Sequence, residues 1–173
     1  MWKKIPELSD VAGYGRCLDL MGVGGIQKST ALMIDGMEVQ HTQDKFAVFY
    51  LTIVPYFKVT EGYEFDKEVK LGRRDLRSGH QTASARQSSE RVIIDLQWGS
   101  PHAGSGHEEY WLNSDGQLCA ESSVTVNGQT STTLQVYARQ NAALDNRYYG
   151  KKQELPFGID ANKISSNLMS MFD

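Results

Sequence analysis

Alternating apolar and polar residues predict β-strands along most of this chain. The clearest run is Arg91–Trp98, in which every second residue is apolar and would lie on one face of a strand. Residues 107–139 hold three more strand-like runs, separated by Asp115-Gly116 and Asn127-Gly128. Such dipeptides are typical of two-residue hairpin turns, because both central residues of the turn have positive φ. The pattern therefore predicts an antiparallel meander over 107–139, with the strand at 91–98 beside it.

The amino-terminal part shows a helical pattern. Apolar residues between 8 and 21 recur at three- and four-residue spacing, and Ser9 and Asp10 are suitable helix caps. Gly13 and Gly15 interrupt the apolar stripe, which predicts two short helices or one kinked helix instead of a single straight one.

Short strands are predicted on either side of this helical segment. A strand is expected at Trp2–Ile5, and Asp35-Gly36 predicts a hairpin turn between strands at 29–34 and 37–42. The remaining strand-like runs are 45–57, which contains Pro55, and the weaker runs 59–65 and 79–87. With about ten short strands and frequent tight turns, the pattern is all-β and favours a closed up-and-down barrel, because closure removes exposed strand edges.

Composition narrows the functional classes. At 173 residues the chain is expected to form one barrel domain, and its net charge of −3 gives no sign of a nucleic-acid-binding surface. The densest group of basic residues is interspersed with carboxylates, so we expect a solvated turn there. The basic members are Lys70, Arg73, Arg74 and Arg77, and the acidic ones are Asp66, Glu68 and Asp75.

Cysteine usage and hydropathy indicate an intracellular protein. Cys17 and Cys119 lie far apart without a CxxC motif, which fits a reducing compartment and argues against a disulfide scaffold or a zinc site. No apolar run approaches the roughly 20 residues of a membrane-spanning helix, and the first residues lack the apolar core of a secretory signal. We therefore expect a cytoplasmic protein with no transmembrane segment.

Two segments resemble the sequence motif of a phosphate or metal site but lack part of it. Gly22–Ser29 is close to a phosphate-binding loop, but Gln27 stands at the second glycine and the segment follows a helical pattern instead of a strand. His102 and His107 have carboxylates beside them, yet they lie in a glycine-rich stretch without fixed ligand spacing. A solvated loop is expected there, and no metal site.

Carboxylate spacing does not predict catalysis either. Asp95, Glu108, Glu109 and Glu121 have no spacing that would pair two carboxylates for acid–base chemistry, so surface charge is their expected role. The chain is therefore predicted to be non-enzymatic and to need no cofactor.

The strand faces at 117–126 and 130–139 are mixed, because neither strand has a purely apolar side. A barrel lined partly by polar groups tends to hold water and a ligand, since buried donors and acceptors need partners. Alternatively, the polar faces point outward. The sequence leaves both interpretations open.

Short segments spread over residues 2–140 follow the order and spacing of a known family's motifs. They are Trp2-Lys3, Tyr14 with Leu18, Met21-Gly22-Val23-Gly24, Phe57-Lys58-Val59-Thr60-Glu61, Gln97-Trp98, Asp115-Gly116-Gln117-Leu118 and Val136-Tyr137. In this order they resemble the cytosolic fatty-acid-binding proteins, which are calycins. The resemblance implies a ten-stranded β-clam over residues 1–140, with a short helix-turn-helix lid near its open end. It also implies a water-filled cavity for a fatty acid or similar amphiphile.

The resemblance further implies where the polar end of a ligand would bind. The family grips a fatty carboxylate with two arginines and a tyrosine, which form charge-assisted hydrogen bonds. Tyr137 stands at the tyrosine position, whereas Gln135 and Trp111 stand where the arginines are expected. Three other arginines could substitute only if strand register turns them inward: Arg86, Arg91 and Arg139. A fatty acid, a neutral lipid, another amphiphile and no ligand at all are therefore the alternatives.

Residues 141–173 extend beyond the last strand of the family and are expected to form a separate extension. Its apolar residues form a short extended patch and one face of a predicted helix: Leu155 and Phe157, then Ile164, Leu168 and Phe172. A helix of about a dozen residues is marginal alone in water, so it needs a surface to dock on, either its own barrel or a protein partner.

Two functions from different classes follow from these observations. The first is an intracellular lipid-binding protein that holds a fatty acid or other hydrophobic small molecule in its barrel. The second is a structural or adaptor subunit of a larger assembly, which keeps the barrel but not ligand binding and docks through its carboxyl-terminal extension.

Overall fold

A single curved sheet forms the body of the molecule. The computed structural model describes residues 1–52, 58–75 and 77–140. Its strands are β1 (Trp2–Lys4), β2 (Ile34–His41), β3 (Lys45–Thr52), β4 (Lys58–Glu64), β5 (Glu68–Gly72), β6 (His80–Ser88), β7 (Arg91–Trp98), β8 (Gly104–Leu112), β9 (Leu118–Val126) and β10 (Gln129–Arg139). The 10 strands are hydrogen-bonded in the order β4-β3-β2-β1-β10-β9-β8-β7-β6-β5, and all neighbouring pairs are antiparallel.

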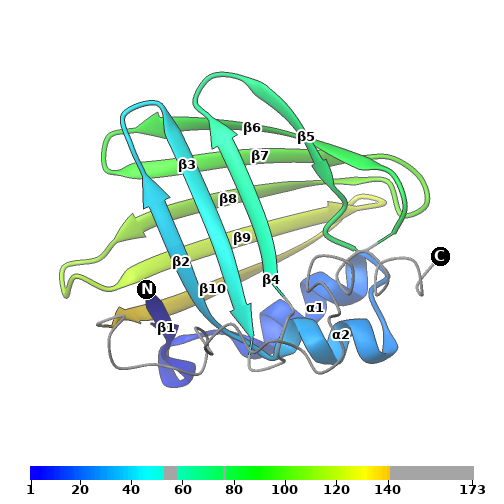
Figure 1. Cartoon of the computed structure of the whole chain (residues 1–173). Helices are drawn as coiled ribbons and strands as arrows, with labels where there is room; N and C mark the ends of the chain where they lie inside the picture. Colours follow the sequence, from blue (N-terminus) through cyan, green and yellow to red (C-terminus); the bar gives the residue numbers. More distant parts are fainter. Residues whose placement is uncertain (53–57, 76, 141–173) are drawn as a thin grey trace, which may run out of the picture.

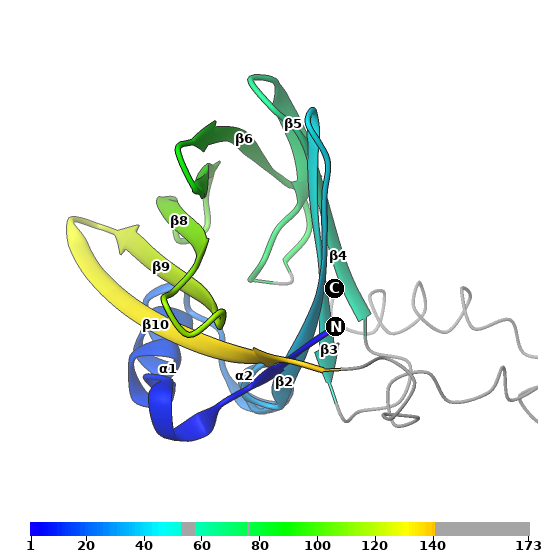
Figure 2. The same ribbon diagram turned by 90° about the vertical axis from the view of Figure 1, so that its left-hand side faces the viewer.

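The sheet bends round until it almost closes on itself. Figure 2 shows one wall made of β2, β3 and β4 and a second wall that includes β6, β8, β9 and β10. Strand β1 joins the two walls, because it pairs with both β2 and β10. The predicted all-β, ten-stranded up-and-down barrel is thus confirmed (Figure 1).

The tight turn predicted between the last two strands is also confirmed. Asn127 and Gly128 have φ values of 52° and 75°, and Val126 pairs directly with Gln129. Positive φ at both central residues gives the turn the twist that the flanking strands need.

The two-residue turn predicted at Asp115-Gly116 is wrong. The Asn113 side chain accepts hydrogen bonds from the amides of Asp115 and Gln117, at 3.0 and 2.9 Å. These bonds stabilise a wider connection over 113–117, an arrangement typical of asparagine in loops.

The hairpin predicted at Asp35-Gly36 is wrong as well. Residues 34–41 form the continuous strand β2, and Gly36 pairs with Lys3 on one side and with Leu51 on the other. The register shifts between Ile34 and Gly36, so the dipeptide lies in a bulge inside the sheet, a common place for glycine. The predicted strand at 29–34 is largely replaced by helix α2 (Gly25–Leu32).

Two α-helices lie at one end of the barrel (Figures 1 and 2). Helix α1 (Val11–Leu20) follows a short 3-10 turn, η1 (Pro6–Leu8), and packs against β10 and β9. The Asp10 side chain caps α1 by accepting a hydrogen bond from the Gly13 amide at 2.7 Å. Within the described residues, no helix is long and apolar enough to cross a membrane.

The break predicted at Gly13 and Gly15 is absent, because α1 runs through both residues. Gly13 instead allows the helix to approach the sheet closely. A Cβ atom at this position would lie 3.0 Å from the carbonyl oxygen of Thr132 on β10. The glycine is therefore a packing residue and not a helix break.

Buried side chains form one continuous core inside the barrel. Alternate residues of the strands point inward, as Val92, Ile94 and Leu96 do in β7, and Cys17 and Leu18 of α1 join the same cluster. The inner face is not wholly apolar. Its buried polar residues include Glu61, Gln81, Glu108, Thr133 and Gln135. In β10, polar side chains thus point inward, as the first of the two interpretations predicts.

Candidate functional site

One guanidinium group joins the two walls of the barrel. Arg74, which follows β5, donates from Nε and Nη2 to the two carboxylate oxygens of Glu61 on β4, at 2.8 and 2.6 Å. Its Nη2 also donates to Glu108 Oε2 on β8 at 2.9 Å, and its Nη1 donates to Glu108 Oε1. Both glutamates are only 4% exposed. The three side chains form a buried charge cluster that spans the barrel interior.

Hydroxyl groups complete the hydrogen bonding of the two carboxylates. Tyr63 donates to Glu61 at 2.9 Å. Tyr110 and Ser122 donate to Glu108 at 2.9 and 3.1 Å. Each carboxylate therefore has both charged and neutral donors, which is the condition under which buried charges are tolerated.

Aromatic rings of the two walls meet beside the charge cluster. The hydroxyl groups of Tyr50 on β3 and Tyr110 on β8 lie 2.9 Å apart. The rings of Phe46 and Tyr110 are 5.2 Å apart between centroids and tilted by 53°. Side chains from opposite walls thus contact each other directly inside the barrel.

Mutual electrostatics keep Arg74 and Glu108 ionised. Burial would lower the pKa of Arg74, but the charges of Glu108 and Glu61 more than offset this effect and raise that pKa well above its usual range. Burial likewise disfavours the ionised Glu108, yet Arg74 and the hydroxyl donors hold its pKa below the usual value. Arg74 and Glu108 therefore form an ion pair inside the barrel.

The Arg74 side chain is less buried than those of its partners. It is 22% exposed, compared with 5% for Glu61.

A second polar group lies near β1 and the start of α1. The Lys4 ammonium is 5.5 Å from the ring centroid of Tyr14 and 6.0 Å from that of Tyr137. Burial lowers the pKa of Lys4 to about 8, against a smaller opposing effect of Asp35. Burial also raises the pKa of Tyr14 to about 12 and that of Tyr137 above its usual range.

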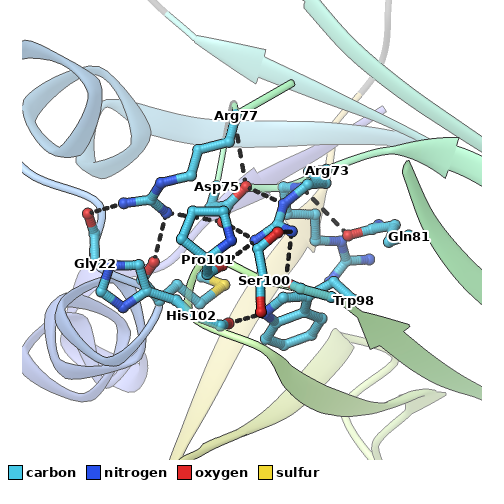
Figure 3. A network of polar contacts seen from close by, with 12 residues as sticks. Gly22, Arg73, Asp75, Arg77, Gln81, Trp98, Ser100, Pro101 and His102 are labelled. Atoms are coloured by element: carbon cyan, nitrogen blue, oxygen red, sulfur yellow. Dashed lines mark hydrogen bonds and ion pairs between the residues drawn. The ribbon is translucent and has the colours of Figure 1, made fainter. Parts of the chain in front are cut away.

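A third network fastens the β5–β6 connection at the rim of the barrel, as Figure 3 shows. Arg73 donates to the Asp75 carboxylate at 2.9 and 2.6 Å, and to the carbonyl oxygens of Gly99 and Pro101 at 2.6 and 2.7 Å. The hydrogen bond to Asp75 raises the pKa of Arg73. The side chains of Arg73 and Asp75 are only 3% and 2% exposed.

Arg77 links this network to the helices. It donates to the carbonyl oxygens of Met21 and Gly22, which end α1, at 2.8 Å each, and to Asp75 at 2.8 Å. The solvated turn predicted for this group is thus wrong for its arginines, although Asp66, Glu68 and Lys70 are exposed as expected. Arg73 is buried and Arg74 and Arg77 are half-buried, because carboxylates and main-chain carbonyls satisfy each guanidinium.

The structure places only part of the predicted ligand site on the inner face. Tyr137 and Gln135 of β10 are buried there, and Gln135 Nε2 donates to the Asp10 carbonyl at 3.0 Å. Trp111 lies on the opposite face of β8 from Tyr110, with the Arg91 guanidinium 4.4 Å from its ring centroid. Likewise, Arg86 is exposed and pairs with Asp95.

The charge cluster was not predicted from the sequence, although a signal is present. Glu61 and Tyr63 are two residues apart, and so are Glu108 and Tyr110. Residues at this spacing share a strand face, so a Glu-x-Tyr pattern in two strands indicates that each carboxylate has a hydroxyl donor beside it. The inward direction of Arg74 has no such signal, because it lies in a connection.

The remaining predicted residues lie elsewhere. His107 is on the outer face of β8, where its ring nitrogens contact Asp95 at 2.6 Å and Glu109 at 3.3 Å. In the described ranges, no group of three or more His, Cys, Asp or Glu residues could hold a metal ion. The predicted docking residues lie outside the described residues: Leu155, Phe157, Ile164, Leu168 and Phe172.

A separate hollow lies on the outside of the barrel. It has a volume of about 490 Å³ and is lined mainly by polar residues of β5–β9, among them Thr82, Asp95, His107 and Thr125. These side chains point away from the charge cluster, so the hollow is not part of the interior site.

Comparison with known proteins adds structural neighbours but no sequence relatives. No protein-family model and no curated protein sequence matches the chain. A mutant of the fluorescent protein UnaG superposes with a TM-score of 0.63 at 16% identity, over 80% of this chain and 92% of the other. The REP1-NXSQ fatty acid transporter gives a TM-score of 0.62 at 14% identity, over 81% and 93%. Lipid binding protein 8 of Caenorhabditis elegans, without ligand, gives 0.63 at 11% identity, over 80% and 92%. The chain therefore has the ten-stranded fold of the fatty-acid-binding proteins, as its short motifs predict.

Proposed function

We propose that the protein is a non-enzymatic binding protein that holds a fatty acid or other hydrophobic small molecule inside its barrel. The main support is the charge cluster of Arg74, Glu61 and Glu108, which lies among apolar residues of the inner wall and in which the Arg74 side chain is 22% exposed. Binding sites for small molecules combine these features: apolar walls and a few fixed polar groups.

The structural neighbours support the same function. Two of them are described as a fatty acid transporter and a lipid binding protein, and both share the fold over most of their length. In this proposal Tyr137 and Gln135 belong to the inner wall of the site, whereas Trp111 and Arg86 lie outside it. The free and buried thiols of Cys17 and Cys119 support an intracellular location.

The alternative function as an adaptor subunit depends on residues 141–173. These residues lie outside the described part of the chain, so docking through the extension stays a prediction.

Native mass spectrometry and calorimetry test the proposal together. Gently purified full-length protein is expected to carry the mass of a bound amphiphile, and the neutral probe dodecanol is expected to bind the delipidated chain in calorimetric titrations. Ala120→Phe, on the inner face between Tyr110 and Gln135, should fill part of the site and weaken dodecanol binding about tenfold, or ~1.4 kcal/mol.

Ala138→Phe is the matched control, because Ala138 lies on the outer face of β10 and its replacement should leave dodecanol binding unchanged. An empty barrel that also fails to bind dodecanol would contradict the proposed function.

A further inference from the structure

We propose that the charge cluster receives an amphiphile with a cationic, ammonium head group and disfavours fatty carboxylates. This inference rests on the proposed function and specifies the class of ligand. Its basis is the balance of charge and hydrogen-bonding groups inside the barrel.

The cluster has an unequal number of formal charges. It contains the cation of Arg74 and the two carboxylates of Glu61 and Glu108, which gives a formal net charge of −1. A cationic head group beside the carboxylates would balance this formal charge, whereas an anionic one would increase it.

Arg74 is largely occupied by its partners. Four of its five N–H groups donate to the two glutamates, which leaves one N–H group of Nη1. A fatty carboxylate could therefore form only one hydrogen bond with the guanidinium without displacing a glutamate, and it would add a third anion to the same buried space. Each of these effects weakens carboxylate binding.

The aromatic and polar groups of the barrel interior also favour a cation. Tyr50, Tyr63 and Tyr110 belong to the same network, and aromatic ring faces attract ammonium groups. Elsewhere, Gln135 Oε1 and Asp35 Oδ1 are buried acceptors without a hydrogen-bond partner among the described residues. Gln81 Nε2 is the one buried donor without a partner among the described residues, so unpaired acceptors outnumber unpaired donors there.

Three probes with the same alkyl chain test the head group directly. Dodecylammonium, dodecanol and dodecanoate are titrated calorimetrically into the delipidated full-length chain at neutral pH and concentrations that keep each probe monomeric. Dodecylammonium is expected to bind most tightly and dodecanoate most weakly, with at least about a tenfold difference in Kd between these two.

Two neighbouring glutamates provide a matched pair of variants. Glu108→Gln removes one carboxylate from the cluster and leaves Arg74 paired with Glu61, so the preference for dodecylammonium should fall about tenfold. Glu109→Gln removes the adjacent carboxylate, which lies on the outer face and pairs with Arg91, and should preserve the preference. An equal loss in both variants would show that the ammonium binds the acidic surface, and would overturn the inference.

Gln135→Arg completes the set by adding a cation to the inner face. It should raise the affinity for dodecanoate, while Thr132→Arg on the exposed outer face of β10 should not. If dodecanoate binds the unmodified chain as tightly as dodecylammonium, the inference is overturned and the proposed function stands. If none of the three probes binds, both fail. The order of the probes on the unmodified chain decides the matter even if Glu108→Gln does not fold.

Discussion

Glu108 and Glu109 are neighbours in sequence but have opposite environments. Glu108 is 4% exposed and is held by Arg74, Tyr110 and Ser122 inside the barrel. Glu109 lies on the outer face, where Arg91 and His107 hold its pKa below the usual value. Strand alternation alone causes this difference. Removal of the ion-pair partner should reduce the stability of the fold strongly only for the buried Glu108, because exposed ion pairs contribute roughly 0–1 kcal/mol.

The same alternation limits what could be predicted for individual residues. Alignment with family motifs placed Trp111 at the ligand, but the inward side chain at this level of β8 is Tyr110. A shift of one residue reverses the face of every side chain in a strand, and short motifs do not fix the register that closely. Tyr137 and Gln135, which the same resemblance places at the ligand, are both buried.

Lys4 gives a prediction for the pH dependence of stability. Its pKa is about 8 in the folded protein, below its usual value, mainly because burial disfavours the charged form. Folding is therefore opposed below pH 8, where Lys4 must be buried as a cation, and this penalty disappears as pH rises towards 10. We expect Lys4→Met to have a higher free energy of unfolding than the unmodified chain at pH 7, with a gap that shrinks between pH 8 and 10.

Urea denaturation at four pH values measures this gap, and the difference between the two proteins cancels the titration of other groups. Lys3→Met, on the opposite face of β1, is the matched control. A gap that stays constant from pH 7 to 10 would contradict burial of a charged Lys4.

At the scale of the elements, the β5–β6 connection contacts several separate parts of the fold. Arg73 binds the β7–β8 loop, Arg74 binds both walls, and Arg77 binds the end of α1. One short stretch of chain thus holds segments that are distant in sequence, and Figure 3 shows its contacts with the β7–β8 loop and with Gly22 after α1. Sequence patterns detect regular elements, whereas such a connection has no periodicity to read, which is why a solvated turn was expected here.

Arg77→Met is expected to loosen the helices. The change removes two charge-assisted hydrogen bonds to the carbonyls of Met21 and Gly22, while Asp75 keeps Arg73 as its partner. The expected loss of stability is about 1–3 kcal/mol. Amide hydrogen exchange in α1 and α2 should become faster, because the segment between the two helices loses its attachment to the β5–β6 connection. Arg86→Met, which removes an exposed arginine from the outer face, should leave exchange in both helices unchanged.

The strands themselves were largely predictable, and the failures have a common cause. Regular alternation placed β7, β9 and β10 correctly and β8 in part, because β8 begins at Gly104, within the glycine-rich stretch that was expected to be a loop. Dipeptides gave mixed results: Asn127-Gly128 forms the expected turn, Asp115-Gly116 belongs to a wider loop, and Asp35-Gly36 lies inside β2. A glycine after an acidic residue fits a turn or a bulge equally well, and only the strand partners on both sides decide between them.

For the molecule as a whole, the barrel closes within residues 1–140. The Gln140 amide donates to the Met1 carbonyl at 3.0 Å, immediately beyond the pairing of β1 with β10. All 10 strands of the described sheet thus lie before residue 140. The domain boundary at 140, with 141–173 as a separate extension, stays a prediction.

A chain that ends at Gln140 tests this boundary. We expect it to fold and to bind dodecanol as the full-length protein does, because the walls, β1 and the charge cluster are all retained. Proteins that co-purify with the full-length chain should be lost from the truncated one. Circular dichroism, calorimetry and mass spectrometry of co-purified proteins give the three readouts. Unchanged co-purification would remove the support for docking through the extension.

The position of β1 has a consequence for how the barrel is assembled. Strands β2 to β4 and β5 to β10 each follow one another along the chain, so two meanders can form from local contacts. The strand ladder that joins them is the three residues of β1, where Trp2 pairs with both Met37 and Arg139. Pairings between the two ends of a chain are slow to form. During synthesis the first strand made must therefore wait for the last one, and closure of the barrel is expected to be the slow, final step of folding.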